Sequence, residues 1–318
     1  MNTIPKLVPL VCAVLLCGCG PDNPPTKSSD GSSTSTSSTP SGTTTTGDTT
    51  TTDATTTTPI GGTFSYDPVG QLKVDKDGNT TGTGDADATV WGDSIRFPLK
   101  CAPAFANSQV YNLGGMNYPG GWCDDANYKY PWQDNFCETR ANQDQTAYVC
   151  PQKAGIHQGQ DIRANTRCDN KGHSEADGTF WTDSDTKLWR TKYQAVAVED
   201  GYISHIGTYS LYLEVTKDGE PRRNYTYLHM HLAPGIVEGQ NVTKGMVLGT
   251  VSNEFGVDSH GNPKIGQTNP HLHFEIRTVI EGTNGTAYFT FVSPYMTLVS
   301  AYQRLLAAGN DVSCPADK

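Results

Sequence analysis

Histidine and aspartate residues stand at spacings that could build a metal site. The segment "GIHQGQDIR" places His157 and Asp161 four residues apart, and "NPHLHFEIR" places His271 and His273 on either side of one leucine. Catalytic zinc takes three protein ligands, from imidazole nitrogens and carboxylate oxygens, and keeps one position for water. His157, Asp161 and one histidine of the H-x-H pair would make such a set.

The H-x-H pair lies in a segment with the period of a β-strand. Successive side chains of a strand point to opposite faces, so His271, His273 and Glu275 share one face. The opposite face is apolar and consists of Leu272, Phe274 and Ile276. A solvated position is the simplest interpretation for Glu275, although its carboxylate could also orient a ligand.

A further imidazole-bearing segment, "NYTYLHMHL", has the same two-faced pattern. Alternation puts His229 and His231 on one face together with Tyr225 and Tyr227. The other face holds Thr226, Leu228, Met230 and Leu232. If the two strands belong to one sheet, their histidine faces can line a single site.

The elements that must position these residues are mainly short strands. From residue 193 onward, apolar alternating runs are bounded by Gly, Pro, Asn or Asp, as in "YQAVAVEDGYISHIG", "SLYLEVTKDGE", "GMVLGTVSN" and "TAYFTFV". This pattern predicts a mainly β fold with an antiparallel sheet. The segment 293–309 predicts one C-terminal helix packed on that sheet, with Ser293 as N-cap, Pro294 in the first turn and Gly309 as its stop.

The N-terminus is typical of export. Residues 1–19 hold one lysine, a short apolar run and small residues before Cys19, and the run is too short to span a bilayer. Leu16-Cys17-Gly18-Cys19 resembles a bacterial lipobox, which would make Cys19 a lipid-modified residue. Ordinary secretory cleavage is the alternative, because Cys17 is unusual in such a box.

Composition divides the rest of the chain into three parts. Residues 20–61 are dominated by Thr, Ser, Gly, Asp and Pro, and we expect a flexible linker. Residues 62–150 predict an N-terminal loop-rich region packed on the catalytic domain. Residues 151–318 predict that domain itself, with the C-terminal helix.

The number of cysteines indicates disulfide bonds, and the net charge argues against some binding partners. Of the nine cysteines, Cys12, Cys17 and Cys19 belong to the signal, which leaves an even set of six: Cys101, Cys123, Cys137, Cys150, Cys168 and Cys314. In an exported chain this set predicts disulfide-stapled loops, whose pairing the sequence does not give. The formal net charge of −10 argues against non-specific binding to nucleic acid or to an anionic membrane surface.

Taken together, the motifs resemble those of the lysostaphin-like, or LytM-type, zinc endopeptidases that cut peptidoglycan. The family signature of H-x-x-x-D, then Y-x-H-L/M, then H-x-H reads here as His157-Gln158-Gly159-Gln160-Asp161, Tyr227-Leu228-His229-Met230 and His271-Leu272-His273. The resemblance covers about residues 150–295 and includes the order of the motifs. It implies a hydrolase of the cell wall. The lipobox-like segment adds a location: if Cys19 is lipidated, Gly20 lacks the aspartate that retains some lipoproteins at the inner membrane, so we expect an anchor in the outer membrane facing the periplasm or at the cell surface.

The resemblance also implies roles for individual residues. His157, Asp161 and His273 would be the ligands of one zinc ion, with His271 beside the metal as a catalytic group. His229 follows Tyr227-Leu228 in the family register and would be the second catalytic histidine. His231, two residues further on, remains an alternative for that role, and the sequence does not tell which histidine is the base.

The implied reaction is hydrolysis of a peptide cross-link of peptidoglycan by a metal-activated water. A catalytically silent LytM-like protein that binds or regulates the cell wall is the alternative. Another zinc enzyme or a cupin would leave His157 and Asp161 unexplained. The remaining histidines, His173, His205 and His260, have no motif around them, and loops or turns are expected there.

Overall fold

The computed structural model describes a part of the chain that lies within the unit Asp53–Lys318. The described residues are 64–70, 73–74, 80–81, 87–106, 128–137, 157–164, 193–252, 254, 258–261, 271–281 and 285–308. The predicted signal segment with Cys19 and the predicted linker 20–61 lie outside them, as do Cys123, Cys150, Cys168 and Cys314. The boundaries of the four predicted segments therefore stay predictions.

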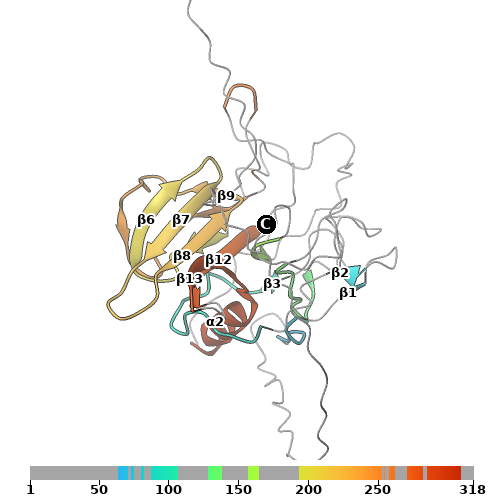
Figure 1. The fold of residues 1–318 in the computed structure, drawn as a ribbon. Coiled ribbons are helices and arrows are strands. Elements are labelled where there is room, and N and C mark those ends of the chain that lie inside the picture. The colour runs from blue at the N-terminus through green and yellow to red at the C-terminus, as the bar shows by residue number, and fades with distance from the viewer. Residues whose placement is uncertain are drawn as a thin grey trace, which may run out of the picture. The chain divides into compact units, whose positions relative to one another are not determined.

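The predicted antiparallel sheet is confirmed. Eight strands form one sheet in the order β10-β6-β7-β8-β12-β4-β3, and β13 pairs with β12 beyond this path. Figure 1 shows β6, β7 and β8 side by side and continuing into β12 and β13. The strands are β3 (Ala104–Ala106), β4 (Gln160–Ala164), β6 (Gly201–Ile206), β7 (Ser210–Val215), β8 (Arg223–Leu228), β10 (Asn241–Val242), β12 (Leu272–Glu281) and β13 (Ala287–Val292).

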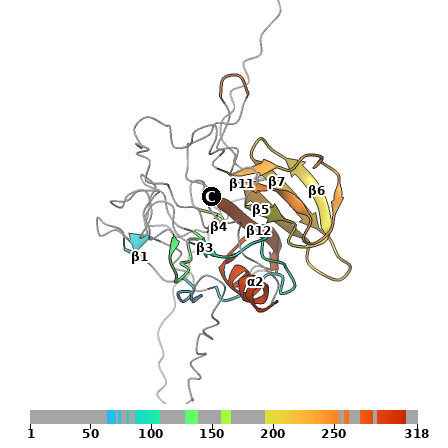
Figure 2. The same ribbon diagram turned by 180° about the vertical axis from the view of Figure 1, so that it is seen from behind.

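Two smaller sheets accompany the main one. The first has the order β5-β11-β9, formed by β5 (Gln194–Val196), β11 (Val247–Val251) and β9 (Met230–Leu232), and Figure 2 shows β5 and β11 from behind. The second is the pair β1 (Lys73–Val74) and β2 (Thr80–Thr81). The hydroxyl of Tyr227, on β8, donates to the carbonyl of Val196 at 3.0 Å and accepts from the amide of Val198 at 3.1 Å. These bonds tie the β5-β11-β9 sheet to the apolar face of the main sheet.

One helix, α2 (Tyr295–Ala307), follows β13, as the sequence predicts. Its N-cap is Pro294, one residue later than expected, and the hydroxyl of Ser293 accepts a bond from the amide of Tyr295 at 3.4 Å. Tyr302 of α2 packs against an aromatic cluster with Phe64, Phe97 and Trp132. Residues from the predicted loop-rich region thus share one apolar core with α2 and the sheet.

The two faces of β12 behave as its alternation predicts. Leu272, Phe274 and Ile276 belong to the apolar core. Asp161 on β4 and Leu228 on β8 stand directly opposite His273. Because cross-strand partners point to the same side of a sheet, Asp161 and His273 meet on the other face.

The segment "NYTYLHMHL" does not form one continuous strand, and the face predicted for its two tyrosines is wrong. Tyr225 and Tyr227 pair with Ile276 and Phe274 and lie in the core, not on the face of His273. The chain leaves β8 after Leu228, and His229 has a left-handed backbone with φ of 60°. The next residues form β9 in the other sheet, so strict alternation ends at His229.

A buried charge network lies under the far end of β8. The carboxylate of Glu199 accepts hydrogen bonds from Lys217 at 2.8 Å, from Tyr225 at 2.6 Å and from Arg223 at 3.1 Å. Burial by itself raises the pKa of Glu199, but the hydrogen bonds and the Arg223 charge outweigh it, so the pKa is lowered.

Two further observations concern the predicted disulfides and membrane attachment. Cys101 and Cys137 are buried, and each forms a disulfide bond. The described residues do not show which cysteines are paired. Within the described ranges, no helix has the length and apolar character needed to cross a bilayer.

Candidate metal centre

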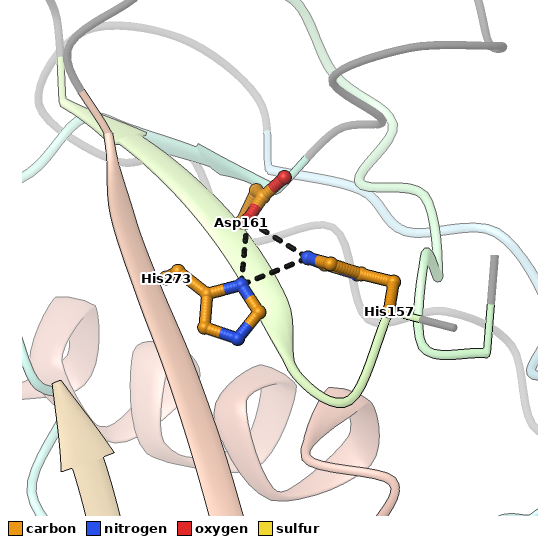
Figure 3. A group of neighbouring side chains, drawn as sticks. All are labelled: His157, Asp161 and His273. Atoms are coloured by element: carbon orange, nitrogen blue, oxygen red, sulfur yellow. Dashed lines mark hydrogen bonds and ion pairs between the residues drawn. The ribbon is translucent and has the colours of Figure 1, made fainter. Parts of the chain in front are cut away.

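Three of the predicted site residues converge in the structure. Nε2 of His157 lies 3.0 Å from Oδ1 of Asp161 and 2.8 Å from Nδ1 of His273, and Nδ1 of His273 lies 3.0 Å from the same Asp161 oxygen. Figure 3 shows the two rings and the carboxylate turned toward one another, with Asp161 on β4 and His273 on β12. All three residues are buried.

The outer nitrogen of each imidazole has an acceptor that fixes the ring. Nδ1–H of His157 donates to the carbonyl of Asn135 at 2.7 Å, and Nε2–H of His273 donates to Oε1 of Glu275 at 3.0 Å. Glu275 is buried, so the interpretation as a solvated strand carboxylate is wrong. Acceptors of this kind set the orientation and tautomer of metal-ligating histidines.

Local sequence explains why the two elements come so close. A Cβ atom on Gly159 would lie 2.5 Å from the carbonyl oxygen of Phe274 and 2.7 Å from Nε2 of His273. Only glycine therefore allows the turn between His157 and Asp161 to lie against β12. The segment 133–137 supports this turn from the other side, because the amide of Cys137 donates to the carbonyl of His157 at 2.7 Å.

The donor atoms fit a zinc ion. With the outer nitrogens protonated, the lone pairs of Nε2 of His157 and Nδ1 of His273 face each other across 2.8 Å, beside a carboxylate oxygen. Three electron-pair donors at such distances repel unless a positive charge lies among them. Oδ2 of Asp161 is also buried and accepts no hydrogen bond from the described residues. Zinc prefers this combination of two imidazoles and a carboxylate, whose ligand atoms stand roughly 3.3 Å apart in a tetrahedral site.

Electrostatics of the metal-free site agree with this interpretation. Burial alone would raise the pKa of Asp161, but the charges of His157 and His271 and the hydrogen bonds from His157 and His273 lower it well below 3.8. Burial alone would lower the pKa of His273, but hydrogen bonds to Asp161 and Glu275 raise it to about 9. A proton therefore supplies the positive charge of the cluster when no metal is bound.

Two more predicted residues, His271 and His229, lie beside the cluster. Nε2 of His271 lies 3.5 Å from Oδ1 of Asp161. The ring centroid of His229 is 4.5 Å from that of His271 and 6.5 Å from that of His273, and Tyr209 stacks on His229 with ring centroids 5.7 Å apart. The left-handed backbone at His229 makes this possible, since strict alternation would turn its imidazole to the core face of Tyr227.

His231 is placed differently from His229. Its Nδ1 lies 3.1 Å from the carboxylate of Glu254, and 42% of its side chain is exposed. Nδ1–H of His229 donates to the backbone carbonyl of the same Glu254 at 2.9 Å. Glu254 thus connects the two histidines, but it is His229 whose ring packs against His271.

Sequence reasoning missed Asn135 and Glu254, and no motif marks either residue, because their roles come from a backbone carbonyl or from packing between distant segments. Of the histidines expected in loops or turns, His260 lies in a turn, whereas His205 lies on β6. The third, His173, lies outside the described residues.

Comparison with known proteins gives matches among solved structures alone. No family model matches the chain, and no curated protein matches it. A lytM protein from Ruminococcus gnavus ATCC 29149 is 20% identical over 46% of this chain and 47% of that chain, with a TM-score of 0.29. An M23 protein from Pseudomonas aeruginosa is 16% identical over 45% of this chain and 43% of that chain, with a TM-score of 0.26.

A third structure is the catalytic domain of a point mutant of the prophage-encoded M23 protein EnpA from Enterococcus faecalis. It is 17% identical over 45% of this chain and 79% of that chain, with a TM-score of 0.25. This chain spans less than half the length of the first two structures. Identities and TM-scores this low carry no argument about function.

Proposed function

We propose that this chain is a zinc-dependent endopeptidase that hydrolyses peptide cross-links of bacterial peptidoglycan. The observation that carries the proposal is the convergence of His157, Asp161 and His273 next to a second pair of imidazoles, His229 and His271. Three ligands for one zinc ion, with groups beside them that can transfer a proton, suit the hydrolysis of an amide by a mononuclear zinc enzyme.

In this proposal His157, Asp161 and His273 hold one zinc ion. When bound, the ion supplies Lewis-acid polarisation of the scissile carbonyl and lowers the pKa of water toward about 7. Asn135 and Glu275 keep the two ligand rings in the orientation that points their lone pairs inward.

We assign the proton transfer to His229. Its Nδ1–H is held by the carbonyl of Glu254, so the lone pair of the neutral ring is on Nε2. Nε2 can accept a proton from the attacking water and return it to the leaving amine. His271, packed on His229, is positioned to orient that water or to stabilise the negative charge that develops on the substrate oxygen.

Peptidoglycan as the substrate rests on the sequence motifs and on the predicted export signal. Lipidation of Cys19 would hold the chain at an envelope membrane, and a linker of about 40 residues can reach on the order of 130 Å when extended. Such a tether would let a catalytic domain reach the cell wall. In a Gram-negative wall, the expected bond is the cross-link between D-alanine and a diamino acid.

Purified sacculi test the proposal. Wild type is expected to release peptide fragments, identified by mass spectrometry, and to contain about one zinc ion per chain. Asp161→Ala should lose both properties. His229→Ala should keep zinc and lose about 100-fold or more in rate, while His231→Ala should keep both within a few-fold.

Glu238→Ala is the matched control, because Glu238 is exposed and pairs with His205 away from the predicted ligands. An Asp161→Ala chain that binds zinc and digests sacculi like wild type would refute the proposal. A wild-type chain that binds zinc and sacculi without cleaving them would favour the alternative of a silent cell-wall binding protein.

A further inference from the structure

The sheet face that carries His273 extends well beyond the metal centre. Along β12 this face continues from His273 through Glu275 to Arg277, because side chains two residues apart share a face. The residues directly opposite on β8 are Leu228, Thr226 and Asn224. On β13, Phe291 stands opposite Arg277 and Phe289 lies two residues before it. We call this surface of β8, β12 and β13 the histidine face.

Arg277 is held on the histidine face by two aromatic rings. Its guanidinium carbon lies 4.9 Å from the ring centroid of Phe289 and 4.8 Å from that of Phe291. Such cation–π contacts favour one orientation of the planar guanidinium, which reduces the entropy lost when it binds a ligand. Arg277 is therefore a positioned cation on a half-buried side chain.

The positive charge of Arg277 has no anionic partner in the part of the chain that the structure describes. Its Nε is buried and donates no hydrogen bond there. A neighbouring arginine shows the contrast: Arg222 also lies over Phe289, at 4.7 Å, but it makes two hydrogen bonds to the carboxylate of Glu214. Phe289 thus contacts two guanidinium groups: that of Arg222 is neutralised by Glu214, and that of Arg277 has no counter-charge among the described residues.

Neighbouring polar atoms on the histidine face are also unsatisfied. Oγ1 of Thr226 and Oδ1 of Asn224 are buried and have no hydrogen-bond partner among the described residues. Asn224 stands directly opposite Arg277, and Thr226 stands opposite Glu275. Buried polar atoms without partners are costly. Asn224 and Thr226 are uncharged, so they do not neutralise Arg277, and among the described residues the charge of this half-buried side chain is left for an anionic ligand.

We propose that Arg277 binds a carboxylate of the peptide substrate and so makes the enzyme selective for acidic peptides. Arg277 is four residues along β12 from His273, a distance of about 13 Å at ~3.3 Å per residue. An extended peptide covers the same distance in about four residues. The recognised carboxylate therefore lies within about four residues of the scissile bond, on one side of it. This inference rests on the proposed function.

Cross-linked muropeptides from sacculi, with their carboxylates free or converted to amides, test the proposal. Wild type is expected to have a kcat/KM about 10- to 100-fold higher for the free-carboxylate form, the range for a charge-assisted hydrogen bond. Arg277→Gln should remove this preference mainly by raising KM for the carboxylate form. Its zinc content and its kcat/KM for the amide form should stay within about twofold of wild type.

Two further variants separate recognition from packing. Arg222→Gln removes the paired arginine on the same ring and should keep the preference for carboxylates. Arg277→Lys keeps the charge but not the planar fork, so it should restore part of the preference. Equal kcat/KM values of wild type for the two forms would overturn the proposal, as would an equal loss on both forms in Arg277→Gln.

Different experimental outcomes would refute the proposed function and the proposed carboxylate site. If wild type cleaves neither form, the proposed function has failed, and calorimetric binding of the two forms then decides about Arg277. A binding preference for the carboxylate form that is lost in Arg277→Gln supports the site. Equal binding of both forms by wild type overturns it.

Discussion

Removal of the Glu275 carboxylate should weaken zinc binding without removing a ligand. Its Oε1 accepts the Nε2 proton of His273 at 3.0 Å in a buried setting. A hydrogen bond to a charged group contributes about 1.5–3 kcal/mol. Loss of such an outer partner lowers metal affinity about 10- to 100-fold. We expect Glu275→Ala to show this full loss and Glu275→Gln, which can still accept the bond without its charge, to show less.

Two measurements give the size of the effect. Competition with a chromophoric chelator gives the Kd for zinc directly. Urea unfolding with zinc at 100 times the wild-type Kd should show stabilisation by about 2.7 kcal/mol in wild type. At the same zinc concentration, Glu275→Ala should gain only about 0.4–1.4 kcal/mol. Each variant is compared with its own metal-free form, so that any change in intrinsic stability cancels.

The pH of this assay matters because a proton competes with zinc at His273. The pKa of His273 in the metal-free protein is about 9, and removal of Glu275 weakens proton binding together with metal binding. At pH 9, competition from the proton raises the apparent Kd for zinc only about twofold, so the measured change in Kd mainly reports metal binding. Glu238→Ala, at an exposed carboxylate paired with His205, is the control. A Glu275→Ala protein whose Kd stays within twofold of wild type would show that our reasoning is wrong.

Two predictions concern the packing that supports the site. Gly159→Ala should cost about 1–3 kcal/mol of unfolding free energy and weaken zinc binding, because the new Cβ would lie 2.5 Å from the Phe274 carbonyl and 2.7 Å from Nε2 of His273. Glu199→Gln should cost about 3 kcal/mol at pH 7. The pKa of Glu199 is lowered in the fold, so its ionised form stabilises above the unfolded value of about 4.3, and this contribution is lost as pH falls through the folded pKa. The difference between wild type and Glu199→Gln in urea unfolding should therefore shrink below about pH 4.

Controls for both variants come from the same chain. Gly219→Ala has open space around its Cβ and a φ of +78°, so it should cost only about 1–2 kcal/mol and leave zinc binding unchanged. Gly159→Ala with unchanged zinc affinity would contradict the close approach of the turn to β12. A constant difference between wild type and Glu199→Gln from pH 3 to pH 7 would contradict the linkage argument.

On β12, the alternation of side chains along a strand predicted both faces correctly. Its period of two is a local property, so the separation of His273 and Glu275 from Leu272 and Phe274 could be predicted without any partner strand. The burial of Glu275 could not be predicted, because it depends on what packs over that face.

The same rule failed on the preceding histidine segment for a physical reason. Alternation assumes an extended backbone at every residue, and His229 has a φ of 60° where the chain passes from β8 to β9. A left-handed residue costs about 1–2 kcal/mol, and its position is set by the two sheets that it connects. The sequence motif indicated His229, whose ring packs against His271. Its predicted face was wrong, because the chain does not continue as one extended strand through residue 229.

The sequence by itself determined the donor types, their order along the chain and the two-faced character of β12. Tertiary structure decided which of these donors meet: Asp161 stands opposite His273, 112 residues away, and the carbonyl of Asn135 holds His157 from a segment without any motif. The physical reason is that side-chain chemistry and strand period are encoded locally. Register between remote strands depends instead on the packing of the whole apolar core.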